Sequence, residues 1–278
     1  MNTDSSNHLN LCFPQWQGSG RENLLYHGAM VIQRHLRPMV FETIDLPENS
    51  DLGLSNGILG YPEILDQLER CCAMIAARSP ETIFTIGGDC GVEPGPVTWL
   101  NRQYPDDLAL IWLDAHGDLN TPATSPSGHF HGMPLGAICG QGDAGILGRC
   151  FSRVSPDQVI LAGARALDPA EVDFVEGTGL CSISVERLRE DPHCLAALCR
   201  EKQLGRAYVH IDLDVLDPGV YKNVKHPTPG GIEPDTLCRL VENLAVSLSV
   251  VGLGIVEFVP DGGTGLSLVD RLLSAACR

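Results

Sequence analysis

Acidic residues and histidines gather in two short segments of this sequence, each at the end of an apolar run. Asp114, His116 and Asp118 form one group, and Asp212 and Asp214 form the other. Carboxylates that crowd together repel one another unless a cation lies between them. Oxygen ligands with one imidazole suit hard divalent ions such as Mn²⁺, and a pair of such ions makes hydroxide available near neutral pH. We therefore predict a two-metal site with these five residues as ligands.

The members of each group are two positions apart. Alternate residues of an extended backbone point to the same side, so we expect Asp114, His116 and Asp118 to face one site from one strand end. Asp212 and Asp214 repeat this spacing on a second strand. A single Asp-x-Asp more often caps a turn, but two such groups with a histidine among them favour metal binding.

Three further residues are candidates because of their positions. His131 lies in a Ser- and Gly-rich loop after the first group, where its ordinary pKa near 6.5 suits a proton shuttle, although loop histidines are usually solvated. Glu257 ends an apolar run and would suit a cationic group of a substrate. Asp168 precedes Pro169, which is typical of a helix N-cap, with a contact to a substrate ammonium as the alternative.

Apolar strands and amphipathic helices alternate along most of the chain, and these elements must position the candidates. We expect strands at 9–13, 82–86, 108–113, 158–162, 180–185, 207–211 and 250–257, and helices at 22–36, 62–78, 94–104, 168–176, 186–203, 233–248 and 266–276. This alternation predicts an α/β fold of three layers, α/β/α, with a mostly parallel sheet. Ligands bind at the carboxyl ends of such strands, where both groups lie. Site loops are expected at 117–134 and 217–232, and a surface loop at 45–60.

Composition narrows the class of protein further. The 278 residues carry a net charge of −16, which argues against nucleic acid or an anionic membrane as partner. We see neither an apolar run of about 18 residues nor a secretory signal at the start. Eleven cysteines without a CxxC pair indicate a reduced, cytoplasmic protein. At this length we expect one domain, residues 1–278.

Together these motifs resemble the arginase/ureohydrolase family, also called the arginase–agmatinase family, over roughly residues 80–260. The resemblance implies a three-layer fold, two Mn(II) ions, a homo-oligomer, and hydrolysis of a guanidino group to urea and an amine. It implies that the five residues of the two groups bind metal, with Asp114 and Asp212 bridging the ions. His131 then resembles the proton shuttle, Glu257 the guanidinium partner, and Asp118 a residue that orients the attacking hydroxide.

The resemblance points to the arginase branch of the family on the substrate side. Asn120 and Ser127 match positions that arginases use near the α-carboxylate, and Asp168 and Glu171 match the α-amino side. His129 stands where arginases typically carry Asn, and a Ser-Pro pair nearby replaces a Thr-rich stretch. The implied substrate is therefore free arginine, an arginine-containing peptide, or an N-hydroxylated arginine. A catalytically weak arginine-binding protein and a purely structural metal site are the alternatives.

Cys90 is the sharpest departure from the family pattern. The family's Gly-Gly-Asp-His motif supplies a histidine ligand, and this chain has Gly87-Gly88-Asp89-Cys90. We take Cys90 as the sixth metal ligand. Four ligating aspartates and a thiolate give −5 against +4 from two divalent ions, whereas the histidine version balances. A thiolate also prefers metals softer than manganese, so other divalent ions are possible; a protonated Cys90 would instead leave one ion weakly held.

Overall fold

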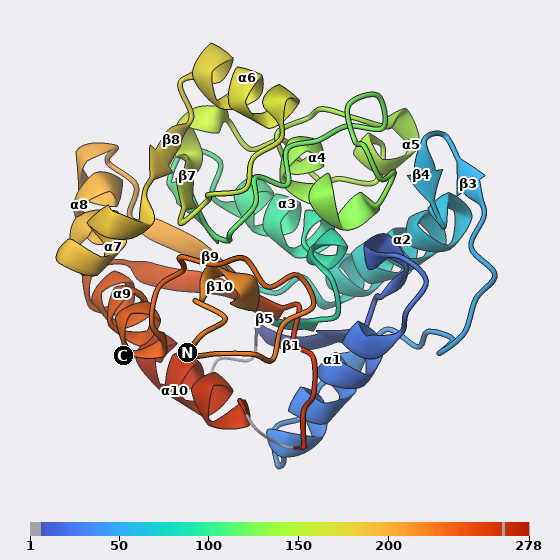
Figure 1. The fold of residues 1–278 in the computed structure, drawn as a ribbon, viewed down its shortest axis with the longest axis horizontal. Helices are drawn as coiled ribbons and strands as arrows, with labels where there is room; N and C mark the ends of the chain where they lie inside the picture. Colours follow the sequence, from blue (N-terminus) through green and yellow to red (C-terminus); the bar gives the residue numbers. More distant parts are fainter. Residues whose placement is uncertain (1–6, 263–264, 278) are drawn as a thin grey trace.

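The computed structural model describes residues 7–262 and 265–277, and an eight-stranded sheet lies at its centre (Figure 1). The strand order is β2-β1-β5-β10-β9-β6-β7-β8, and every neighbouring pair is parallel. The strands are β1 (His8–Phe13), β2 (Glu42–Thr43), β5 (Thr82–Gly87), β6 (Leu108–Leu113), β7 (Val159–Ala162), β8 (Cys181–Ile183), β9 (Arg206–Asp212) and β10 (Ser249–Val256).

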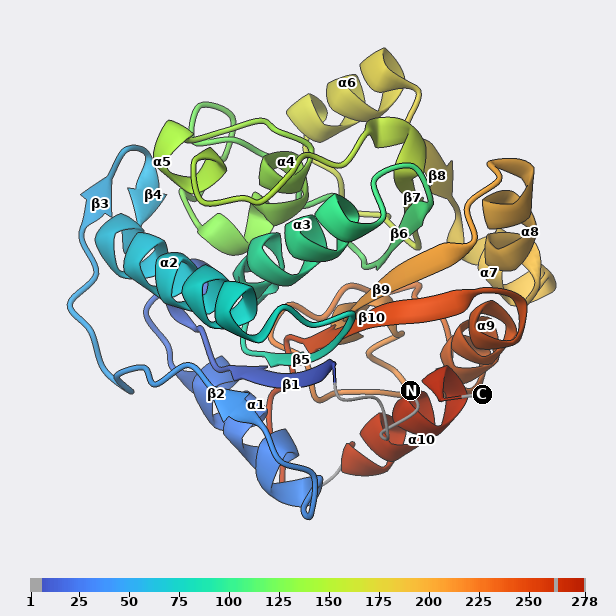
Figure 2. The ribbon, with the colours of Figure 1, turned by 180° about the vertical axis from the view of Figure 1, so that it is seen from behind.

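Helices cover both faces of this sheet (Figures 1 and 2). One face carries α1 (Leu24–His35), α7 (Val185–Glu190), α8 (Cys194–Glu201), α9 (Pro234–Ser247) and α10 (Leu266–Ala276). The other carries α2 (Tyr61–Arg78), α3 (Pro94–Gln103), α4 (Pro134–Ile138) and α6 (Pro169–Thr178), with α5 (Ala144–Leu147) beside α2 and α4. The three-layer α/β/α prediction is confirmed. In the described ranges, no helix is long and apolar enough to cross a membrane.

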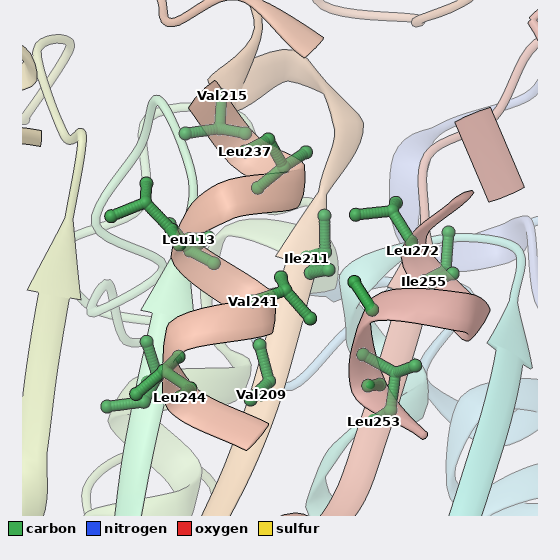
Figure 3. Packing of buried hydrophobic residues seen from close by; sticks show 14 of the residues in the cluster. Leu113, Val209, Ile211, Val215, Leu237, Val241, Leu244, Leu253, Ile255 and Leu272 are labelled. Carbon is green, nitrogen blue, oxygen red and sulfur yellow. The ribbon is translucent and has the colours of Figure 1, made fainter. Parts of the chain in front are cut away.

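Each face of the sheet has its own apolar core, as the alternation of side chains along a strand requires. Along β6, Ile111 and Leu113 pack under α9, whereas Leu110 and Trp112 pack on the opposite face. Figure 3 shows how α9 covers its face through Leu237, Val241 and Leu244, which lie on one side of the helix. Burial of each such side chain contributes about 1.5–3 kcal/mol, so these two cores fix the sheet that holds the site.

Two sequence-based expectations about elements are wrong. The single helix expected at 186–203 is divided into α7 and α8, because Asp191 is extended before Pro192, which has no N–H to continue a helix. The loop expected at 45–60 contains a small antiparallel hairpin, β3 (Leu54–Ser55) and β4 (Ile58–Leu59). Its turn uses Asn56 and Gly57 at positive φ, which is a common hairpin signal.

Candidate active site

The predicted metal ligands and Glu257 come from the carboxyl ends of four neighbouring strands in the middle of the sheet. These strands are β5, β10, β9 and β6, in that spatial order. Cys90 follows β5, Glu257 follows β10, Asp212 ends β9, and Asp114 follows β6. Residues up to 167 positions apart in the sequence therefore meet at one edge, since 257 − 90 = 167.

Asp114, His116 and Asp214 form the first ligand group. Nδ1 of His116 lies 3.0 Å from Oδ2 of Asp214 and 3.4 Å from Oδ1 of Asp114. Asp114 and Asp214 are buried. Their ligand atoms, with that of His116, lie within 4.8 Å of one another, so one ion could contact all three.

Cys90, Asp114, Asp118 and His210 form the second ligand group, which shares Asp114 with the first. All four are buried, and their ligand atoms also lie within 4.8 Å of one another. Cys90 connects this group to Asp212, because its Sγ donates to Oδ2 of Asp212 at 3.1 Å. The structure thus brings together all six predicted metal ligands and adds His210, which was not predicted.

The convergence of the predicted ligands does not come from an extended backbone. Asp114 to Asp118 lie beyond the end of β6, and Asp118 reaches the site with φ +53°; Asp214 lies in a 3₁₀ turn after β9. Glu257 has φ +62°. Non-glycine residues adopt such left-handed backbone conformations at a cost of about 1–3 kcal/mol, often at functional sites. These side chains meet as the sequence predicts, but Asp118 and Asp214 reach the site from turns beyond the strand ends and not by alternation along an extended strand.

Burial and mutual repulsion raise the pKa of most carboxyl groups here. Burial first, and then the charge of Asp114, raise the pKa of Asp118 and Asp214, and burial with Asp214 raises that of Asp212. Burial would lower the pKa of His116, but its hydrogen bonds to Asp114 and Asp214 raise it to about 12. The metal-free site therefore retains protons that metal cations would displace.

These donors fit a pair of metal cations. Within the described ranges, Oδ2 of Asp118 and Nε2 of His210 are buried without a hydrogen-bond partner, which costs free energy unless another group fills the place. The carboxylates crowd around these atoms. Oxygen, nitrogen and sulfur donors of this kind are the usual ligands of first-row transition metals.

Glu257 links the ligand groups to a cluster of histidines. Both of its carboxylate oxygens are buried and lack hydrogen-bond partners, and burial raises its pKa to about 8. Its ligand atom lies within 4.8 Å of Cys90 and Asp212 on one side and of His131 and His226 on the other. Nδ1 of His131 is 3.5 Å from Oε1 of Glu257. A cationic group beside this carboxylate would stabilise it, because burial of an unpaired charge costs free energy.

His131 is held as a neutral imidazole. Burial, and then the positive charges of His116 and Lys225, lower its pKa to about 4. The ring of His226 stacks on it with centroids 4.9 Å apart, and burial lowers the pKa of His226 to about 3. A pKa this low leaves the ring neutral at pH 7, so in the metal-free site His131 would carry a proton only transiently.

A cavity of about 520 Å³ opens above His116 and Asp118. Five of the six residues that the sequence placed on the substrate side line this cavity, namely Asn120, Ser127, His129, Asp168 and Glu171. Glu257, the sixth, is buried and is not among the lining residues. Nδ2 of Asn120 donates to Asp168 at 2.9 Å. Glu171 accepts from the backbone N–H of Leu119 and of Asp168, so its carboxylate also fixes the wall. Asp168 is the helix N-cap that the sequence predicted.

Two residues of the site were missed by the sequence analysis. His210 stands two positions before Asp212 within the extended β9, so the alternation argument applied to this pair could have found it. His226 lies in the expected site loop 217–232, but nothing in its spacing separates it from an ordinary surface histidine.

Comparisons with known proteins agree with this geometry. A model of the arginase family matches residues 26–270. The chain belongs to the arginase family. It is therefore a hydrolase that acts on carbon–nitrogen bonds in linear amidines.

Similar relatives include the arginase of Staphylococcus aureus (strain MRSA252), 29% identical over 74% of this chain and 70% of that protein. The arginase of Bacillus subtilis (strain 168) is 32% identical over 68% of this chain and 67% of that protein. The arginase of Staphylococcus aureus (strain COL) is 30% identical, and the match spans 56% of its length.

Solved structures share the fold almost from end to end. An arginase of Entamoeba histolytica in complex with L-ornithine has a TM-score of 0.82, with 21% identity over 97% of this chain and 98% of that one. The proclavaminate amidino hydrolase of Streptomyces clavuligerus has a TM-score of 0.74, with 20% identity over 97% and 90% of the two chains.

Proposed function

We propose that this member of the arginase family hydrolyses the guanidino group of an arginine-type substrate, giving urea and an ornithine-type amine. Its cofactor would be two Mn(II) ions, or other divalent ions because of Cys90. The observation that supports this best is the place of Glu257. Its buried, unpartnered carboxylate lies between the candidate ligand groups and the histidines near the cavity. A guanidinium would satisfy both of its oxygens at once, since the two are matched in geometry.

Each residue of the site has a place in the proposed reaction. The first and second ligand groups, together with Asp212, would hold the ions, which when bound would supply a hydroxide near neutral pH. Glu257 would bind and orient the guanidinium, and Asp118 would orient the attacking group. His131 would accept a proton as a neutral imidazole and then pass that proton to the leaving amine, which returns the ring to its neutral form.

The outer cavity wall would select the part of the substrate far from the guanidino group. Asn120, Ser127 and His129 would face its carboxylate end, and Asp168 and Glu171 its amino end. His129 and the Ser125-Pro126 pair, which depart from the arginase pattern, lie in this wall. An arginine-containing peptide and an N-hydroxylated arginine are therefore alternative substrates of the same chemistry. A cytoplasmic location and a homo-oligomer remain predictions.

Urea release by Mn-loaded protein tests the proposal, with free L-arginine, an internal-arginine peptide and Nω-hydroxy-arginine assayed side by side. Turnover of free arginine would assign an arginase, and turnover of the peptide alone would assign a peptide-directed enzyme. Glu257→Gln is the matched control, because it keeps the shape but not the charge. We expect it to lower kcat/KM by at least about 10²-fold. Arginine binding without urea from any substrate would contradict the proposal.

A further inference from the structure

We propose that His210 supplies the imidazole ligand of the second metal ion, in place of the histidine that the family resemblance expects at position 90. This assignment rests on the proposed two-metal site and concerns a residue that no sequence motif assigned. Nε2 of His210 is completely buried and, among the described residues, has no hydrogen-bond partner.

The position of Nε2 suits a shared ion. It lies 3.9 Å from Oδ2 of Asp114, which is too far for a hydrogen bond. It is also less than about 4.2 Å, twice a typical metal–nitrogen or metal–oxygen bond length, so one ion can contact both atoms. Sγ of Cys90 and a carboxylate oxygen of Asp118 lie within 4.8 Å of these two atoms.

The other nitrogen of the ring is already held in the arrangement that a metal ligand needs. Nδ1 of His210 is 2.9 Å from Oε1 of the buried Glu93, and Tyr208 donates its hydroxyl to Oε2 of Glu93. With Nδ1–H donating to Glu93, Nε2 is left with its lone pair directed away from this contact. Metal-binding histidines in proteins commonly have such a carboxylate partner, which orients the ring and raises its basicity.

Packing fixes the ring as well. Trp112 stacks on His210 with ring centroids 3.5 Å apart and planes 15° from parallel, and its Nε1 donates to Oδ2 of Asp114. Glu93 packs directly against β10 at Gly254, where a Cβ would meet its Oε1 at 1.9 Å, so only glycine leaves room for this carboxylate. The ring, its carboxylate partner and the shared Asp114 are thus one rigid unit, which is how preformed metal ligands are supported.

Supply of the imidazole ligand from position 210, and not from position 90, changes the set of donor atoms around the second ion. With His210 present, the imidazole that Cys90 fails to provide is restored from β9, and Cys90 is left as an additional sulfur donor. A nitrogen, sulfur and oxygen donor set favours softer ions such as Co²⁺ and Zn²⁺ over Mn²⁺. The first ligand group has only imidazole and carboxylate donors, so the two ions are held by different chemistry.

Metal titration of four full-length proteins tests this inference without any assay of urea. Wild type, His210→Asn, His116→Asn and Glu93→Gln are dialysed against Co²⁺ and their bound metal is measured. An Asn side chain at position 210 can keep a hydrogen bond to Glu93 while it removes the ligand atom. We expect wild type to bind two ions and each histidine variant one. Glu93→Gln should weaken one ion by about 10- to 100-fold.

Visible and near-ultraviolet spectra then show which ion each variant loses. Cobalt bound by Cys90 gives a thiolate charge-transfer band, which His116→Asn should keep and His210→Asn should weaken. Two ions with wild-type affinity in both His210→Asn and Glu93→Gln, or a wild type that binds fewer than two, would overturn the inference. If His210→Asn fails to fold by circular dichroism, Glu93→Gln decides alone. If the variants bind metal as the wild type does and still release urea, the inference fails and the proposed function stands. If the variants lose metal as expected but the wild type releases no urea, the proposed function fails and the inference stands.

Discussion

The two ligand groups differ in how closely they follow the family pattern. The first, with Asp114, His116 and Asp214, uses only carboxylate and imidazole and is partly open to the cavity through His116. The second adds Cys90 and His210, and all of its members are buried. If both groups bind ions as proposed, the fold keeps the expected donors around one ion and rearranges the donors around the other. Only Asp114 belongs to both groups, so it couples them.

The largest effect is expected where the two groups meet. Asp114→Asn removes a charge that both ions would share, so we expect both to be lost and urea release to fall by at least about 10³-fold. Elemental analysis and kcat/KM on the same preparation measure this. Asp214→Asn is the matched control, since it touches the first ligand group alone and should lose one ion. Two retained ions in Asp114→Asn would break the proposed coupling.

The stability of the metal-free protein should fall as pH rises from 6.5 to 8. The pKa of Glu257 is raised from 4.5 to about 8 by burial, so over this range the folded chain holds a proton that the unfolded chain has lost. The free energy of unfolding should therefore decrease, by about 1–2 kcal/mol from this group. The lowered pKa values of His131 and His226, about 4 and 3, act in the opposite direction, mostly below 6.5 and more weakly up to about pH 7.5. The pKa of His116, raised to about 12, adds to the decrease.

Urea denaturation at these two pH values, with and without metal, measures the effect. Glu257→Gln has no carboxylate to titrate and should show a smaller decrease than wild type. Added metal should stabilise the wild type most at pH 8, where the ligands lose protons readily. A metal-free wild type that gained stability between pH 6.5 and 8 would contradict the electrostatic account of both groups.

A smaller effect should separate the groups by metal preference. Cys90→Ser removes the sulfur donor from the second ligand group and leaves the first unchanged. We expect the preference of the second ligand group for Zn²⁺ over Mn²⁺ to fall roughly tenfold. Competitive dialysis measures this preference. An unchanged preference at both sites would show that Cys90 does not ligate. His116→Asn serves as the control, because its intact second ligand group should keep the wild-type preference for Zn²⁺ over Mn²⁺.

The smallest effect is expected at the cavity wall, outside both groups. Ser127 lines the cavity, and its Oγ accepts from the backbone N–H of His129 at 3.1 Å. Loss of one hydrogen bond to the substrate costs about 0.5–1.5 kcal/mol, so Ser127→Ala should raise KM for the true substrate a few-fold and leave kcat nearly unchanged. Steady-state kinetics on arginine and on the peptide measure this. A large loss of kcat would place Ser127 near the reacting atoms instead.

Much of the fold could be predicted because its signal is repeated along the chain. Continuous apolar strands such as 108–113 alternate with helices, and this pattern is enough for a parallel, three-layer arrangement. The break at Asp191-Pro192 and the hairpin at Asn56-Gly57 carry local sequence signals, a residue before proline and an Asn-Gly pair, that are enough to predict both. The strand order could not be predicted, since it depends on contacts between elements far apart in the sequence.

The convergence of candidate ligands could be predicted where they follow a spaced motif, as in the first ligand group. His210 was overlooked because a histidine inside an apolar strand resembles a core residue. Its assignment needs Glu93, which is 117 positions away and meets it only in the fold. The positive φ of Asp118 and Glu257 was also invisible, because neither residue type announces such a backbone conformation.

Anomalous diffraction from crystals of the cobalt-loaded protein would test the central claim, that two differently held ions share Asp114. We predict two peaks on either side of that carboxylate. One should lie about 2.0–2.2 Å from the His116 nitrogen and the other at a similar distance from Nε2 of His210. A single peak, or two peaks that both lie beyond contact of His210, would contradict the account.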